Sequence, residues 1–583
     1  MDTHHLRKHN RFTAFICGSL LFLSLLKSVG SASLQLESPW TVAALLALTV
    51  VFPLLGTRWF APLENALSRL AARRTACLFL LFFLTIAIRL ALLPIVPYPR
   101  PTIHDEYGYL LQADIFAHGR LAFPSHPMSL FFETFYINFH PTYSAMYPPA
   151  QSAVLAIGQL ASNPWIGVLL STAAMVSAIL WMLQGWFPAR WALLGASLVL
   201  VRFAIFSYWM NSYWGGSVAA IGAALVLGAL PRVQRHQRPR DAFLLGFGVF
   251  ILANSRPFEG AFFCIPVAVV LLFWLLRLRR NHHPLPFRTV VLPITAWLFA
   301  TLAFTLYYDW RLTGDPLLMP RALYYRQYFT VSPFIWGKIL PAIHYSNPQF
   351  EAYFNGWLRH QFDGSFADLR RIEWDRFHTL FTFFIGGLFA IPFLSLPWIL
   401  RSRRLRPVLF QLLFCIFGLI IISWFMPHYA APAFPVFVVI LVQAFRYLRR
   451  FKFPGRPVGI GWTRVLVLCA LFMIPSCILD NLASPGDRMC LSLVYDWQRA
   501  KIVSQLNSTP GDHLIIVQYS PGHRPHRDWV FNSADIDHSK IVWAREIPGV
   551  SLAPLLAYYP QRQVWSVDPD AVPPVLSPYS PAP

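Results

Sequence analysis

The chain has 583 residues, of which 56% are apolar and only 13% are charged, whereas a soluble globular protein carries about 25% charged residues. Apolar stretches close to the roughly 20 residues that a membrane-spanning helix needs recur along the chain. The formal net charge is +22, but the arginines stand in short clusters between the apolar stretches, as in membrane proteins with basic inside loops. The composition therefore excludes a soluble enzyme and argues against a nucleic-acid-binding protein.

The apolar stretches predict an all-α, polytopic membrane protein with about thirteen spanning helices. We expect the first to be a retained helix, because no convincing small-residue cleavage site of a signal peptide follows it. In chain order, the predicted spans are residues 13–30, 39–56, 75–97, 164–186, 191–209, 213–230, 241–255, 258–276, 289–308, 379–400, 407–425, 431–447 and 463–480.

The distribution of arginine predicts the orientation of these spans, because basic loops stay in the cytoplasm. If the N-terminus is cytoplasmic, all the inside loops are basic, namely residues 57–74, 187–190, 231–240, 277–288, 401–406 and 448–462. The short outside turns at 31–38, 210–212 and 426–430 then carry neither Lys nor Arg. Residues 148–161 are apolar but too short to span comfortably, so we expect a juxtamembrane or re-entrant helix at the outer face.

This topology divides the chain into four parts. They are two N-terminal spanning helices with a basic cytoplasmic loop at 1–74, a main transmembrane module at 75–480 with outer loops at 98–163 and 309–378, a small extracytoplasmic α/β domain at 481–572, and a disordered Pro-rich tail at 573–583. Two short strand-like runs, 513–520 and 541–546, predict the α/β domain. The seven cysteines form no metal-binding or disulfide framework, and a bridge between Cys477 and Cys490 is left open.

The most informative feature is the acidic pair Asp105 and Glu106, which opens the first large outer loop. Apolar residues after the pair follow helical spacing and predict an amphipathic helix in the membrane interface, with both acids at its N-terminus. The helix dipole favours charged carboxylates there. Such a carboxylate accepts a proton from a hydroxyl or holds a divalent cation. The structural alternative is that Asp105 merely caps the helix.

From Tyr109 the loop continues as Tyr-x-x-x-Ala-x-x-Phe-x-x-Gly-Arg-Leu and ends in Tyr147-Pro148-Pro149. An acidic pair followed by this pattern resembles the C-type (GT-C) membrane glycosyltransferases, which include the protein O-mannosyltransferase and aminoarabinose-transferase relatives. The resemblance covers roughly residues 75–450, and its further pieces are Gly185–Pro188, Asn211–Gly216 and Asn254–Pro257. One departure is that the acids follow the third predicted span, whereas family members commonly place the acid after their first.

The resemblance implies that the loop acid is a catalytic base toward an acceptor, and that the donor is a sugar on a polyprenyl phosphate. Asp105 and Glu106 are therefore the candidate catalytic residues, and a direct displacement would invert the anomeric centre. Cations at the same face would receive the leaving lipid phosphate. The candidate substrate-binding residues are His104, Tyr109, Arg120, Arg256, Arg321, Arg326, Lys338 and His428.

Several of these candidates have a purely structural interpretation. Arg256 follows a predicted span, from which its side chain would reach the interface. Arg321 and Arg326 lie in a polar loop and fit solvated surface charges, and His428 between two spans fits a structural histidine. Arg202 falls near the middle of the fifth span, where a charge is costly and indicates a cavity or a partner.

Two other functions are compatible with the sequence. A transporter or flippase would carry acids and bases near the bilayer midplane, often on inverted repeats. A non-catalytic membrane scaffold would leave Asp105 and Glu106 in bulk solvent. No Walker or Rossmann glycine pattern is present. Asp105 and Glu106 alone are too few ligands to define a divalent metal site, so no cofactor is assigned and metal dependence is left open.

The expected partners are therefore a polyprenyl-phosphate sugar and an envelope glycan, lipid or protein acceptor, with no nucleic acid. The expected location is a bacterial-type inner membrane, with the site on its extracytoplasmic side.

Overall fold

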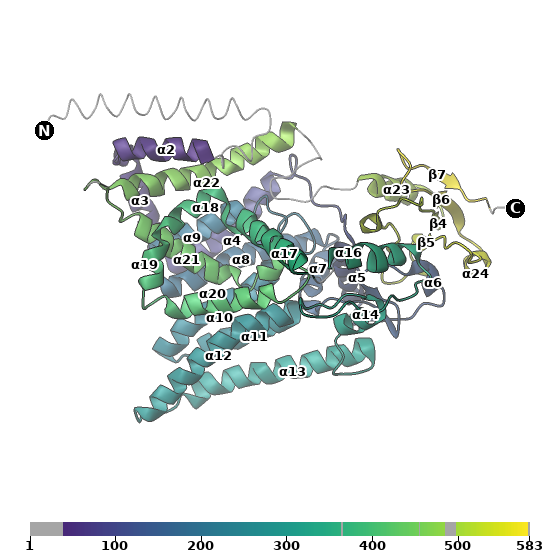
Figure 1. Ribbon diagram of the computed structural model, residues 1–583, viewed down its shortest axis with the longest axis horizontal. Helices are drawn as coiled ribbons and strands as arrows, with labels where there is room; N and C mark the ends of the chain where they lie inside the picture. The colour runs from purple at the N-terminus through teal and green to yellow at the C-terminus, as the bar shows by residue number, and fades with distance from the viewer. Residues whose placement is uncertain (1–38, 363–364, 454, 484–496, 581–583) are drawn as a thin grey trace.

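The structure is a computed structural model that describes residues 39–362, 365–453, 455–483 and 497–580. The molecule is elongated, with a bundle of long helices at one end and a small sheet domain at the other (Figure 1). The arginine-rich C-terminal end of α12 (Pro257–Arg280) lies at the end opposite the sheet. The cytoplasmic position of the N-terminus stays a prediction.

Eight segments of the described residues are helical, long and apolar enough to cross a membrane. They are Arg74–Ala91 (α4), Trp165–Trp186 (α8), Ser217–His236 (α10), Pro257–Arg280 (α12), Phe287–Thr313 (η2, Phe287–Val291, and α13, Leu292–Thr313), Phe366–Arg401, Pro427–Leu448 (η6, Pro427–Ala430, and α21, Phe434–Leu448) and Val458–Leu479 in α22 (Val458–Ala483). The segment Phe366–Arg401 consists of α17 (Phe366–Leu380), η4 (Phe381–Ile385), α18 (Gly386–Ala390), η5 (Ile391–Ser395) and α19 (Leu396–Arg401).

The prediction of thirteen spans is not confirmed. The expected span at 13–30 lies outside the described residues. Four other expected spans form helices below the length of those eight, which are α2 (Pro39–Val51), α9 (Ala189–Phe203), α11 (Pro239–Ser255) and α20 (Arg406–Ile420).

A buried irregular segment explains the shortness of α9. Residues 204–216 follow it without regular secondary structure and lie largely inside the bundle. Side chains satisfy part of this backbone, since the Asn211 amide donates to the carbonyls of Ile205 and Ser207 at 2.9 and 3.0 Å. Irregular backbone at membrane depth is stable only where the protein surrounds it, and apolar sequence alone does not distinguish it from helix.

The outer loops form a compact layer between the bundle and the sheet domain (Figure 1). Their elements are α5 (His104–Ala117), β1 (Phe123–Pro124), α6 (Ser129–Phe132), β2 (Ile137–Asn138), β3 (Thr142–Ala145), α7 (Pro149–Leu160), α14 (Pro320–Tyr328), α15 (Pro348–Phe350), η3 (Glu351–Trp357) and α16 (Leu358–Gln361). The helix predicted at 148–161 is confirmed as α7.

Helix α5 carries the acidic pair and differs from the expected amphipathic surface helix. Its position in the sequence is as predicted, but eight of its 14 residues are buried, on more than one face. Tyr107 stacks on Phe531 of the sheet domain at 3.9 Å between ring centroids, and the Ser152 hydroxyl of α7 donates to the Tyr109 carbonyl at 3.0 Å. Protein therefore packs against both sides of α5, where the sequence predicted contact with lipid.

The C-terminal domain contains a four-stranded sheet, which confirms the strands predicted at 513–520 and 541–546. Its elements are α23 (Trp497–Ser508), β4 (His513–Val517), η7 (Pro525–Arg527), β5 (Ile541–Arg545), α24 (Ala553–Tyr558), β6 (Gln563–Val567) and β7 (Leu576–Pro578). The strand order is β5-β4-β6-β7, with β4 parallel to β5 and β6, and β7 antiparallel to β6.

The expectation of disorder from Pro573 is wrong for strand β7. Residues Leu576–Pro578 pair with Val567, Ser566 and Trp565 at the edge of the sheet. Proline is tolerated there because the outer side of an edge strand needs no backbone donor. A Pro-rich composition therefore did not exclude a short edge strand.

Buried polar contacts join the sheet domain to the first outer loop. Arg545 of β5 forms a 2.8 Å ion pair with Asp528, and Thr134 of the loop donates to the same carboxylate at 2.8 Å. Asp114 of α5 accepts from the backbone N–H of Ala534 at 2.8 Å. Cys477 of α22 is disulfide-bonded, while Cys490 lies outside the described residues.

Candidate functional site

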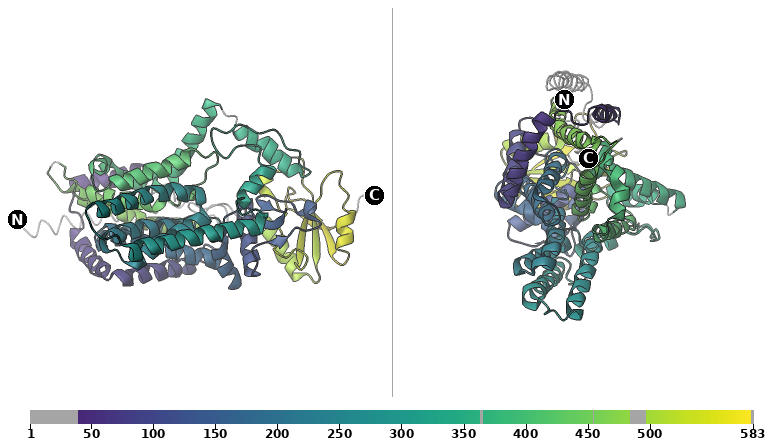
Figure 2. Two further views of the ribbon diagram at one scale, coloured as in Figure 1. Left: turned by 90° about the horizontal axis from the view of Figure 1, so that it is seen from below. Right: turned by 90° about the vertical axis from the view of Figure 1, so that its left-hand side faces the viewer.

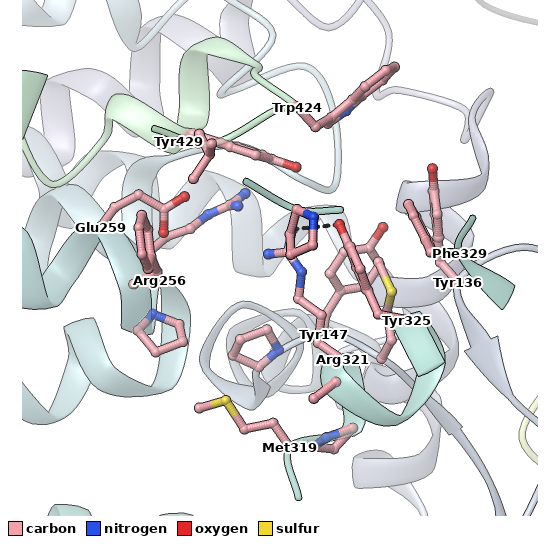
Figure 3. Close-up of a pocket in the computed structure, with 18 of the residues that line it drawn as sticks. Tyr136, Tyr147, Arg256, Glu259, Met319, Arg321, Tyr325, Phe329, Trp424 and Tyr429 are labelled. Carbon is pink, nitrogen blue, oxygen red and sulfur yellow. Dashed lines mark hydrogen bonds between the residues drawn. The ribbon is translucent and has the colours of Figure 1, made fainter. Parts of the chain in front are cut away.

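A cavity of about 500 Å³ lies where the helix ends nearest the sheet domain meet the loop layer. Its walls come from α5, the junction of α11 and α12, the end of α13, α14, and the segments 329–334 and 422–429. Figure 3 shows charged side chains that reach it from the start of α12 and from α14. Its volume is in the range of small-molecule binding sites.

Asp105 lines this cavity from the first turn of α5. The Tyr147 hydroxyl donates a 2.5 Å hydrogen bond to its Oδ1 atom. Burial raises the pKa of Asp105 to about 6, although Tyr147, Arg256 and Arg321 all favour the charged carboxylate. The group is therefore largely ionised at neutral pH and still basic enough to accept a proton.

Tyr147 is held in place by its neighbours on α5. Its ring stacks on Tyr109 at 4.2 Å between centroids. A Cβ atom at Gly108 would lie only 2.9 Å from the Tyr147 ring, so the absence of a side chain there lets the ring pass close to the helix. The pocket around the carboxylate thus depends on Gly108 and Tyr109 as well as on Asp105.

Arg256 and Arg321 approach the cavity from different elements (Figure 3). Arg256, at the junction of α11 and α12, is 8% exposed and lies 4.3 Å from the centroid of the Tyr429 ring. Arg321, on α14, donates to the Tyr325 hydroxyl at 3.2 Å. Glu259 lies on the Arg256 side of the same cavity.

Among the described residues, these two arginines have no carboxylate in direct contact, although Glu259 and Asp105 in the same cavity favour their charged forms from a longer distance. Within the described part of the chain, neither guanidinium forms an ion pair with a carboxylate. A buried charge is costly unless it is paired and hydrogen-bonded. An anionic ligand in the cavity would supply that pairing, and a guanidinium matches the geometry of a phosphate.

Glu106 does not line the cavity, in contrast to Asp105. Its carboxylate accepts hydrogen bonds from the backbone N–H groups of Thr102 and Tyr213, at 2.9 and 3.0 Å. Burial raises its pKa to about 7. No side chain of the described residues caps α5, so Asp105 does not have the capping role considered for it. Glu106 instead binds the backbone before the helix and holds the helix start against residue 213.

Among the other candidates, Tyr109 and Arg326 line the cavity together with Arg256 and Arg321. The remaining four lie elsewhere: His104, Arg120, Lys338 and His428. Arg120 and Lys338 are exposed to solvent.

The two histidines are buried behind the cavity wall. His428 shares a 3.0 Å hydrogen bond with the Tyr208 hydroxyl and contacts Tyr429. His104 packs on Phe135 and lies 5.4 Å from His526 of the sheet domain, between ring centroids. Burial lowers the pKa of His104 to about 3, so it is neutral at physiological pH.

Sequence reasoning missed several aromatic residues of the site. Tyr136, Tyr325, Tyr353, Trp424 and Tyr429 line the cavity without belonging to any motif. The Tyr-Pro-Pro motif did mark Tyr147, although nothing in the sequence indicated its bond to Asp105. His, Cys, Asp and Glu side chains of the described residues form no group of three that could hold a metal ion.

Arg202 also has a structural explanation. Its guanidinium donates to the backbone carbonyls of Thr382 and Phe383, at 2.9 and 3.3 Å. These carbonyls belong to η4 (Phe381–Ile385), a π-helical turn, which is a place where carbonyls turn away from the regular helix pattern. Arg202 therefore links α9 to η4 and is not part of the cavity wall.

No family model and no curated protein matches the chain. Among solved structures, ArnT from Cupriavidus metallidurans bound to undecaprenyl phosphate is similar at 14% identity and a TM-score of 0.45, over 83% of this chain and 92% of that one. The Archaeoglobus fulgidus oligosaccharyltransferase tethered with an acceptor peptide is similar at 11% identity and a TM-score of 0.44, over 85% and 68%.

Proposed function

We propose that the chain is a membrane glycosyltransferase that moves a sugar from a polyprenyl-phosphate donor to an envelope acceptor at the extracytoplasmic face. One observation carries the proposal: Asp105, Arg256 and Arg321 line the same buried cavity, and neither arginine has a carboxylate partner among the described residues. A base and a phosphate site side by side are what transfer from a sugar phosphate requires.

The proposed reaction is a single displacement at the anomeric carbon. Asp105 accepts the proton of an acceptor hydroxyl while the acceptor oxygen forms a bond to that carbon. The bond from the carbon to the phosphate oxygen breaks, and the electron pair leaves with the lipid phosphate. Arg256 and Arg321 stabilise the charge on the leaving phosphate. Attack from the opposite side inverts the anomeric centre.

The position of Tyr147 supports Asp105 as the base. Its hydrogen bond occupies Oδ1, so the acceptor hydroxyl would approach Oδ2, which lies 3.9 Å from Nε2 of His104. This bond and both arginines favour the charged carboxylate, and so limit the rise in pKa that burial causes. A base with a pKa near 6 is ionised at neutral pH without being too weak to take a proton.

The apolar part of the cavity wall supports a lipid-linked donor. Phenylalanines at positions 258, 329, 334 and 362 line it, together with Val331 and Ile422. The first isoprene units of a polyprenyl chain would cover this apolar surface. A nucleotide sugar would instead place the charged groups of its nucleotide against it, which is unfavourable.

The test uses purified protein in nanodiscs with a panel of polyprenyl-phosphate sugars, and measures release of the polyprenyl phosphate. Asp105→Asn keeps the size of the side chain but removes the base, so we expect turnover to fall by at least about 100-fold. Glu106→Gln is the matched control, because Glu106 lies outside the cavity wall and should retain far more activity. Wild-type turnover by Asp105→Asn would refute the proposed base.

A further inference from the structure

Helix α3 (Thr57–Ala72) falls within the segment 57–74, expected to be a basic loop, and most of its residues are exposed or half-buried. Ala71 is its one buried residue. The right-hand view of Figure 2 looks along the long helices, and there α3 lies across their direction while α2 is seen end-on. It lies at the end of the molecule opposite the sheet domain (Figure 1).

Three large apolar side chains of α3 lie on one exposed face. Trp59, Leu63 and Leu67 are spaced four residues apart, so they follow one another along one side of the helix. Their exposed fractions are 71%, 54% and 45%. A helix that presents Trp and Leu on one side and lies across the spanning direction has the form of an interfacial membrane helix.

Arginines flank this apolar row. Arg58, Arg69, Arg73 and Arg74, on the helix and directly after it, are all exposed. Glu64 is the acidic residue of the helix, and its two oxygens are occupied by Arg449 at 2.7 Å and Arg464 at 3.0 Å. These ion pairs connect α3 to Arg449, directly after α21, and to Arg464 of α22. The charged side chains that remain exposed on α3 are therefore all arginines.

We propose that α3 is a docking surface for anionic phospholipid, with Trp59, Leu63 and Leu67 in the acyl-chain boundary and the arginines on the headgroups. Charge complementarity favours this occupant, because basic side chains beside an interfacial helix attract acidic lipids. A protein partner would bind a broad, continuous apolar surface. The apolar surface of α3 is a single row of three side chains, which matches the shallow insertion of an interfacial helix into a membrane. Helix α3 thereby anchors the protein to the membrane surface at a place outside the cavity.

The first experiment measures where the apolar face lies. A nitroxide label is placed on full-length protein as Leu63→Cys, or as Asn65→Cys on a different side of α3, in nanodiscs that contain phosphatidylglycerol. We expect the label at position 63 to collide more often with oxygen and the label at position 65 with an aqueous nickel complex. Greater nickel access at position 63 would overturn the proposal, and so would shielding from both reagents, which indicates a protein cover.

The second experiment measures lipid preference. Phosphatidylglycerol and phosphatidylcholine are titrated separately against Arg58→Gln/Arg69→Gln/Arg73→Gln protein in neutral detergent. Each arginine removed should weaken the apparent affinity for phosphatidylglycerol by about fivefold, with no change for phosphatidylcholine. Arg524→Gln/Arg527→Gln, on the sheet domain, is the control and should bind like the wild type. An unchanged affinity of the triple variant would contradict the proposal.

Discussion

The Tyr147 hydroxyl donates a 2.5 Å hydrogen bond to the Asp105 carboxylate, although 42 residues separate the two in the chain. This contact ties the end of the outer loop to its beginning. It also means that a residue outside the acidic pair helps to set the basicity of the proposed catalytic group.

Replacing Tyr147 by Phe should therefore shift the pH dependence of turnover. Loss of a hydrogen bond to the charged form destabilises the carboxylate, so the pKa of Asp105 should rise by about one unit. The rising limb of the rate–pH profile should move to higher pH, with partial recovery of activity above pH 8. If the rising limb of the rate–pH profile stayed at the same pH, whatever the absolute rate, the hydrogen bond from Tyr147 would not affect the pKa of Asp105.

The wild-type rate should rise with pH through about 6. Asp105 has a pKa of about 6, above the ordinary 3.8 of an aspartate, and below that pH it is protonated and cannot accept a proton. The profile should have unit slope on its acidic side. Measurement of polyprenyl phosphate release between pH 4.5 and 8, with donor and acceptor saturating, gives this limb directly.

The same raised pKa predicts a stability effect of Asp105→Asn. The unfolded carboxylate ionises near 3.8 and the folded one near 6, so ionisation costs folded-state stability, increasingly between these values and fully above 6. The variant should therefore melt at a higher temperature than wild type at pH 8, and the difference should vanish as pH falls toward 3.8. Thermal melts in one detergent at four pH values test this.

Arg256→Gln and Arg321→Gln should each lower turnover by about 100- to 1,000-fold, since each removes a cation from the leaving phosphate. Arg256→Lys should recover part of the loss, because the charge is kept but the planar donor set is not. Arg120→Gln is the control, because Arg120 is exposed and lies outside the cavity wall. Equal losses in all three glutamine variants would point to a nonspecific effect of charge.

Gly108→Ala should reduce activity by displacing Tyr147. The added Cβ would lie 2.9 Å from the Tyr147 ring, and real contacts are longer, so the ring must move away from Asp105. Gly356→Ala is the matched control, because the nearest atom to its Cβ would be 3.8 Å away. We expect the rate–pH profile of Gly108→Ala to shift in the same direction as that of Tyr147→Phe.

Asp528→Asn should loosen the sheet domain. Burial alone would raise the pKa of Asp528, but Arg545 and the hydroxyls of Tyr519 and Thr134 hold it below the ordinary value. Leaving Arg545 buried without its partner should cost about 3–5 kcal/mol. Faster proteolytic release of the C-terminal domain, compared with wild type at pH 7, is the expected result; an unchanged rate would show that other contacts dominate.

The sequence was sufficient to place most helices, the sheet strands and the acid at the site, because helical spacing and apolar runs depend on local residues. Of the six cations that it offered as candidates for a phosphate site, Arg256, Arg321 and Arg326 line the cavity, whereas Arg120, Lys338 and His428 do not. The lengths of the spans were less predictable, since the sequence does not show where regular helix gives way to the buried irregular segment 204–216, which side-chain bonds from Asn211 stabilise.

The division of roles between the two acids was not predictable from their order in the chain. Asp105 and Glu106 are adjacent on a helix, so their side chains project in directions about 100° apart. Which of them faces a cavity depends on residues as distant as Tyr147 and Tyr213. The same holds for His104, whose contact with His526 joins positions more than 400 residues apart.

That contact between His104 and His526 has a consequence for biosynthesis. The first outer loop emerges from the ribosome long before the sheet domain exists, so Thr134 and His104 wait without their C-terminal neighbours while the later helices insert. In truncated chains that end before residue 526, both residues would stay without these contacts, although every residue that lines the cavity would already be made. The first outer loop therefore reaches its final packing only after the last part of the chain has folded.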